Sequence, residues 1–265
     1  MHEQFESASW VLNALCVVVP SVLLSLVILW CLRRWISIHE LKKNHEVAGF
    51  TFSIVGILYS VILGFTVINV QSGYNEVLQT MHTEAILLAD LYQDASFFQP
   101  EEMTRLRTSL RNYVDYVTQE ELGAPRSKTL SFKTRSLLND IWKSYYAIDV
   151  SSEKVKVWYA ESISRLNSFM NARLVRQFNS SQQLGSMMWS LLILGGLITV
   201  SFMCFFGLEN LRSQMLMTAL LVSYLSFMLF LVYSLDHAFR REHGAPPADL
   251  QEVRVLMDQW DADKS

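Results

Sequence analysis

Residues 47–75 read VAGFTFSIVGILYSVILGFTVINVQSGYN and contain no Asp, Glu, Lys or Arg. The hydrocarbon core of a bilayer is about 30 Å thick, so a helix that crosses it needs about 20 mainly apolar residues. This run is long enough to cross. Three further charge-free runs, at 7–32, 177–208 and 213–235, meet the same requirement. The pattern predicts a multi-pass integral membrane protein.

The four runs form two pairs on either side of a long polar block, and this arrangement predicts the fold class. We expect an all-α membrane protein with four transmembrane helices in two hairpins and an extramembrane helical bundle. The predicted divisions are a first transmembrane hairpin (1–71), an extramembrane four-helix region (72–186), a second transmembrane hairpin (187–235) and a polar C-terminal tail (236–265).

Composition excludes several classes of protein. Charged residues make up 18% of the chain, below the roughly 25% of soluble proteins. The net charge of −3 gives a nucleic acid no electrostatic attraction. Cys16, Cys31 and Cys204 lie inside predicted spans, where they act as small apolar residues and not as metal ligands. No phosphate-binding, dinucleotide-binding or nucleophile motif is present, so we expect no enzyme activity, no cofactor and no metal.

Two helices of the polar block carry regular apolar seams that continue the membrane spans. Positions 70, 74, 77, 81, 84, 88, 91 and 95 alternate spacings of four and three, which is the coiled-coil period. Only Gly73 could interrupt this helix, so span two should leave the bilayer as one rod. A second seam runs from Val155 to Ser180, and only Gly185 weakens its continuation into span three.

Each seam contains charged residues. Glu84 lies 13 residues beyond Gln71, and Arg173 lies 14 residues before Met187. If both helices are continuous, the two side chains reach the same level on antiparallel neighbours. We therefore predict a Glu84–Arg173 ion pair, with Arg176 one turn away. Such a pair can fix helix register, or it can form a charged binding site near the membrane, and both interpretations remain open.

Small residues on span two, and polar residues at the exit of span two and before span three, form two further candidate sites. One face of the span carries only small side chains: Gly49, Ser53, Gly56, Ser60 and Gly64. Small residues allow close helix packing, and a pore lining is the alternative. An uncharged collar is expected at the membrane surface, either as ordinary interfacial polarity or as a vestibule: Asn69, Gln71, Asn75, Asn179 and Gln182.

Lys and Arg residues near the span ends predict the orientation, because they favour the cytoplasmic side. The first link and the second hairpin turn together hold five, and the opposite ends hold four. The N-terminal segment before span one holds none. We expect the termini and the large domain on the non-cytoplasmic side of a bacterial inner membrane.

Several stretches carry a resemblance to a known family: GILYSVILGF at 56–65, Tyr74, Glu84-Ala85, Arg173 with Arg176, and LDHAF at 235–239. They resemble the bestrophin-like family of bacterial integral membrane proteins. The closing stretch departs from the family's Asp-x-Pro-Phe-Gly pattern, because Ala238 replaces the proline and Arg240-Arg241 stands where glycine is usual. Bestrophins proper are pentameric anion channels, so the resemblance implies an oligomer and a channel.

Two functions are consistent with the sequence. The first is a membrane scaffold or sensor that binds a partner protein or a ligand through its outer bundle. The second is a homo-oligomeric ion channel in which span two lines the pore, with anions as the candidate permeant ions. No ionisable residue lies in the middle of any span, which disfavours a pump or a coupled transporter. The expected partners are the lipid bilayer, further copies of the chain, and a protein or small ion.

Overall fold

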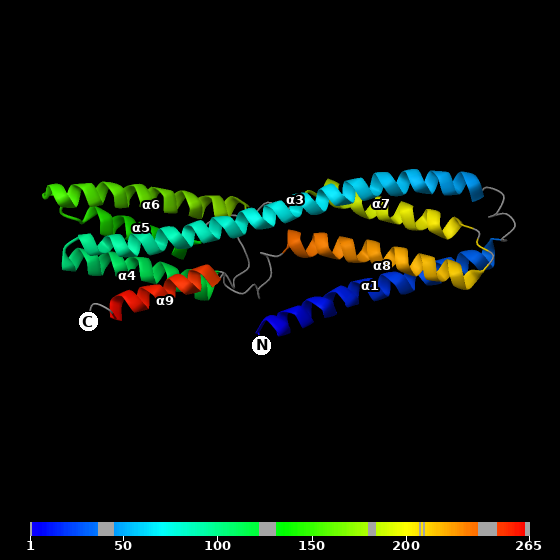
Figure 1. Ribbon diagram of the computed structural model, residues 1–265, viewed down its shortest axis with the longest axis horizontal. Coiled ribbons are helices and arrows are strands. Elements are labelled where there is room, and N and C mark those ends of the chain that lie inside the picture. The colour runs from blue at the N-terminus through cyan, green and yellow to red at the C-terminus, as the bar shows by residue number, and fades with distance from the viewer. Residues whose placement is uncertain are drawn as a thin grey trace. The chain divides into compact units, whose positions relative to one another are not determined.

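The computed structural model describes residues 2–36, 45–121, 131–179, 184–206, 208, 210–237 and 248–262. Within these ranges the chain is helical and has no strand. It separates into two compact units (Figure 1). The membrane unit comprises 1–71 and 184–236, and the bundle unit comprises 72–183 and 237–265.

Four helices are long and apolar enough to cross a membrane, which confirms the predicted all-α membrane fold. They are α1 (His2–Trp35), α3 (His45–Asp94), α7 (Ser186–Phe205) and α8 (Leu211–Asp236). The apolar residues that cover the outside of the membrane unit are exposed, as lipid-facing residues must be.

Within the membrane unit, α1 packs most extensively against α8, and the two helices are antiparallel (Figure 1). Trp10 contacts Phe227 and Phe230 at one end. At the other end Arg33 donates a hydrogen bond to the Leu208 carbonyl. The predicted first hairpin, with span one against span two, is therefore not the main packing of α1. The spans are apolar on all faces, so hydropathy alone does not choose their neighbours.

Helix α3 contains 50 residues and is unbroken, as the seam predicts. At 1.5 Å per residue it is roughly 75 Å long. The corresponding prediction for span three is wrong. Helix α6 (Glu153–Asn179) ends before Gly185, which is extended and forms the N-cap of α7. The Asp236 carboxylate accepts a hydrogen bond from the Leu184 N–H at 2.9 Å, which stabilises this interruption.

The bundle unit contains the outer part of α3 together with short helices whose starts are set by local sequence. Helix α4 (Pro100–Tyr116) begins with a proline and a capping box between Gln99 and Glu102. Helix α5 (Phe132–Tyr146) begins at Ser131, whose hydroxyl accepts from the Thr134 N–H. A 3₁₀ turn (Ala95–Phe97) precedes α4, and a π-helical turn (Val117–Glu121) follows it.

The core of the bundle unit is formed by the predicted seams and by an element that the sequence did not predict. Leu88, Leu110, Ile141 and Phe169 are fully buried there. The segment expected as a polar tail forms α9 (Ala248–Ala262), which packs three apolar residues into the same core: Leu250, Val253 and Met257. This face repeats at helical spacing, so its burial is consistent with an amphipathic helix.

Candidate functional site

A cluster of charged side chains is buried inside the bundle unit. Glu84 from α3 has no exposed surface, and the side chains of Arg173 and Arg176 from α6 are each 3% exposed. Glu121, from the π-helical turn after α4, is 20% exposed. Tyr113 from α4 completes the cluster and is fully buried.

The contacts within the cluster differ by one helical turn from the prediction. Arg176 Nε lies 2.7 Å from Glu84 Oε2, and Arg176 Nη2 donates to Glu84 Oε1 at 3.3 Å. Arg173 pairs instead with Glu121, at 2.6 Å between Nη2 and Oε1. The predicted level match assumed continuous helical rise between α6 and α7, and the extended backbone at Gly185 removes that basis.

The charges in the cluster balance, because two guanidinium groups face two carboxylates. Burial raises the pKa of Tyr113 well above its ordinary value, and the Glu84 charge raises it further. The phenol is therefore neutral, and it donates a 2.7 Å hydrogen bond to Glu84 Oε1. Burial alone would lower the pKa of Arg176, but the charge of Glu84 and its neighbours raises it, so this residue stays charged. The arrangement joins α3, α4, the π-helical turn and α6 through two ion pairs and the Tyr113 hydrogen bond.

Glu121 and Tyr113 were not predicted as members of this cluster. Tyr113 lies in the apolar seam of α4, where an aromatic residue is ordinary core. Glu121 follows Glu120 near a helix end, a position typical of solvated acids. The signal that could have identified them is charge balance, because two seam arginines require a second buried carboxylate besides Glu84.

The predicted small-residue face of α3 is largely open within the chain. Ser53 and Ser60 are exposed. A Cβ atom added at Gly56 or Gly64 would meet nothing within 4 Å. Gly49 differs, because a Cβ there would contact the Phe206 ring at 3.7 Å. Between positions 53 and 64, this face is therefore not used for packing within the described part of one chain.

Glycines on α7 show the opposite behaviour. A Cβ at Gly195 would lie 2.5 Å from Tyr59 Cδ2, and one at Gly196 would lie 3.1 Å from the Tyr59 hydroxyl. That hydroxyl donates to the Leu192 carbonyl at 3.0 Å. Close packing of α3 on α7 therefore depends on the α7 glycines, and the open face of α3 points elsewhere.

The structure describes four of the five residues of the predicted collar. Asn69, Gln71 and Asn75 are exposed on α3. Asn179, at the end of α6, donates to Glu76 Oε1 at 2.9 Å. Gln182 lies outside the described residues.

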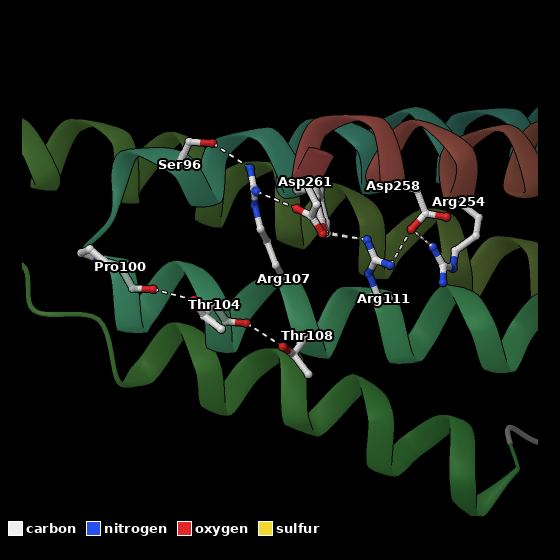
Figure 2. A network of polar contacts seen from close by, with 10 residues as sticks. Ser96, Pro100, Thr104, Arg107, Thr108, Arg111, Arg254, Asp258 and Asp261 are labelled. Atoms are coloured by element: carbon white, nitrogen blue, oxygen red, sulfur yellow. Dashed lines mark hydrogen bonds and ion pairs between the residues drawn. The ribbon is translucent and has the colours of Figure 1, made fainter. Parts of the chain in front are cut away.

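Helix α9 is attached to α4 by a surface network of arginines and aspartates (Figure 2). Arg107 contacts Asp261 at 2.9 Å, and Arg111 contacts Asp258 at 2.6 Å and Asp261 at 2.7 Å. Arg254 on α9 contacts Asp258 and also Asp115 of α4. The network holds α9 over the core.

In the closing stretch of the membrane unit, Asp236 joins the end of α8 to the start of α7. Its second carboxylate oxygen accepts from Trp189 Nε1 at 3.2 Å, beside the bond from Leu184. The stretch 238–247, which carries the departures from the family pattern, lies outside the residues that the structure describes.

Comparison with known proteins gives one match. A family model described as the bestrophin-like domain matches residues 19–250. No curated protein and no solved structure matches the chain.

Proposed function

This chain belongs to the bestrophin-like family, and we propose that it forms a homo-oligomeric ion channel in which α3 lines the path. The observation that carries the proposal is the open face of α3. A membrane helix presents small residues where another helix approaches closely or where a passage must stay wide. No segment of the described chain covers Gly56 or Gly64, so further copies are the natural neighbours.

The composition of this face suits passive permeation. The Ser53 and Ser60 hydroxyls donate to carbonyls of their own helix, so each presents its oxygen only as an acceptor. The glycines leave width, and no charge lies along the span. Rings of polar groups and apolar constrictions are known elements of channels, whereas ionisable relays are typical of pumps. The proposal assigns no catalysis to the chain, and the buried charge cluster serves to hold the bundle.

A liposome flux assay tests the channel. The purified chain is reconstituted, and chloride and potassium fluxes are measured separately. Ser60→Trp places a bulky ring on the open face, whereas Leu58→Trp, about 200° around the same helix, is the matched control at nearly the same depth. We expect flux in the wild type and in Leu58→Trp, and at least a severalfold loss in Ser60→Trp. A monomer without flux under any gradient or voltage contradicts the proposal.

A partner-binding scaffold or sensor is the second candidate, and exposed aromatic residues of the bundle unit favour it. Phe97 and Trp158 stack with their ring centroids 3.5 Å apart, and Phe97 is 41% exposed. Phe132 and Tyr146 are also largely exposed. Aromatic residues are enriched in protein interfaces. Site-specific crosslinking from position 97 that captures one consistent foreign protein, in a preparation without ion flux, would favour this function over the channel.

We further propose that the termini and the bundle unit lie on the non-cytoplasmic side of a bacterial inner membrane, on the support of the Lys and Arg distribution. Lys156→Cys on exposed α6, with the three native cysteines replaced by serine, gives a single reporter. A membrane-impermeant maleimide should label it in cells whose inner membrane is intact. If the label reacts only after the inner membrane is ruptured, the bundle unit lies on the cytoplasmic side and the proposed orientation is wrong.

A further inference from the structure

A crevice of about 410 Å³ lies in the membrane unit between α1, α7 and α8. On α1 its lining runs from Ser21 to Leu32, a length of roughly 16 Å along the helix axis. The volume falls in the range of small-molecule sites, roughly 300–1,000 Å³. The crevice is thus long and narrow, and it follows the direction of the spans.

The walls offer almost nothing to a polar ligand. No charged side chain of the described residues lines the crevice. Three of its four described serines are engaged by their own helices: Ser21 donates to the Val17 carbonyl, Ser25 to Val22 and Ser201 to Leu197, at 2.7–2.8 Å. The Ser226 hydroxyl is the one remaining hydroxyl donor among the described lining residues. A ligand with several polar groups would lose its hydrogen bonds with water and find at most one side-chain hydroxyl here to replace them, which is costly. The chemistry of the walls selects hydrocarbon.

The depth and the mouth of the crevice are also defined. Its floor contains buried residues from two helices, including Val222, Leu225 and Cys204. Leu24 and Leu197 line the mouth and are 62% and 59% exposed, so the crevice opens to the outer surface of the membrane unit. In a bilayer that surface faces lipid tails. A hydrocarbon chain inside would contact protein on three sides, whereas on a flat helix surface it contacts protein on one.

We propose that this crevice is a binding site for one acyl chain of a membrane lipid. An apolar crevice that stays empty leaves the atoms of its walls without contact partners. A lipid tail enters from the bilayer without crossing water, and its head group stays outside the apolar walls. The acyl chain therefore acts as a filling element between α1, α7 and α8.

The first test measures lipid that stays bound through purification. The chain is washed extensively in mild detergent, and bound lipids are extracted and identified by mass spectrometry, which separates phospholipid from free fatty acid. Ser201→Phe and Ser226→Phe fill the crevice. Ser190→Phe is the matched control, because Ser190 is also exposed on α7 and bonded to its own helix but lies outside the crevice.

We expect the wild type and Ser190→Phe to retain comparable lipid. Each filling variant should retain roughly tenfold less, which corresponds to about 1.4 kcal/mol of binding free energy. Unchanged thermal unfolding of the variants shows that they fold. Equal retention in all four proteins overturns the proposal, as does a wild type that retains no lipid.

A second test uses the buried thiol of Cys204 as a reporter in a chain carrying Cys16→Ser and Cys31→Ser. An occupied crevice shields this thiol, so removal of lipid should raise its rate of alkylation by a small apolar maleimide severalfold, and returned lipid should lower it again. The alkylation rate is compared in the same protein with and without lipid, so the result does not depend on the folding of a crevice-filling variant. A rate that is independent of lipid contradicts the site. Ion flux does not enter either test, so a negative result here leaves the channel proposal intact.

Discussion

Glu84 and Arg176 lie 2.7 Å apart inside the bundle unit, and at most 3% of either side chain is exposed. Removal of one partner from such a pair leaves an uncompensated buried charge, whereas removal of both is far less costly. Arg176→Met should therefore destabilise the bundle by about 3–5 kcal/mol. Denaturant unfolding of the detergent-solubilised chain, followed by circular dichroism, measures this change.

Two controls accompany that variant. Lys156→Met removes an exposed pair with Glu153 and should cost less than about 1 kcal/mol. Glu84→Gln combined with Arg176→Met should recover much of the lost stability, because no buried charge remains unpaired.

The pairing itself can be tested by exchanging charges. The exchange Glu84→Arg with Arg176→Glu should fold better than Glu84→Arg with Arg173→Glu. The reverse ranking would restore the register predicted from sequence.

Tyr113 makes the stability of the bundle unit fall at alkaline pH. Burial, and then the Glu84 charge, raises its pKa in the folded state, while the unfolded phenol ionises near pH 10. The folded chain thus keeps a proton that the unfolded chain loses, and stability falls as the pH rises above about 10. Tyr113→Phe should lose about 1.5–3 kcal/mol at neutral pH through the missing hydrogen bond to a carboxylate. It should also show a shallower alkaline decline, and equal slopes in both proteins would contradict this account.

Substitution of a glycine by alanine should change the stability of the chain differently on α7 and on α3. Gly195→Ala forces the Tyr59 ring to move, since the new methyl group would lie 2.5 Å from it, and should cost about 1–3 kcal/mol. Gly64→Ala meets no atom within the chain and should gain up to about 1 kcal/mol in helix propensity. Thermal unfolding of the monomer in detergent measures both. A loss at position 64 equal to that at 195 would show that the α3 face is packed within the chain.

The attachment of α9 should weaken in acid. Hydrogen bonds from Arg254 and then Arg111 lower the pKa of Asp258. A lowered carboxyl pKa stabilises the folded state above the unfolded value of about 3.9, and this contribution is lost as the pH falls below it. Hydrogen exchange of 248–262, corrected for intrinsic rates, should accelerate below about pH 4. Asp258→Asn should show faster exchange already at pH 7 and a smaller acid response.

Hydropathy and helix breakers predicted the parts of the fold that depend on local chemistry. Four apolar runs became four span-length helices, and α3 is continuous because Gly73 alone does not interrupt a strong seam. The partners of each span could not be predicted, because helices that are apolar on every side have no face that marks a neighbour. The α1–α8 contact is a tertiary property.

The candidate sites show the same contrast between local properties, which the sequence predicts, and tertiary contacts, which it does not. Buried positions for Glu84, Arg173 and Arg176 follow from their places in the seams, but the pairing depends on where α6 ends. The level match treated α6 and α7 as one helix through Gly185, so the partner predicted for Glu84 is wrong by one turn. Helix α9 was missed because its acids dominate the tail, although Leu250, Val253 and Met257 recur at helical spacing.

One consequence concerns truncation of the chain. Leu250, Val253 and Met257 of α9 are buried in the core of the bundle unit. A chain cut after residue 237 would leave the apolar surface that these residues cover open to water. A deletion in this segment therefore removes part of the hydrophobic core and not a dispensable tail.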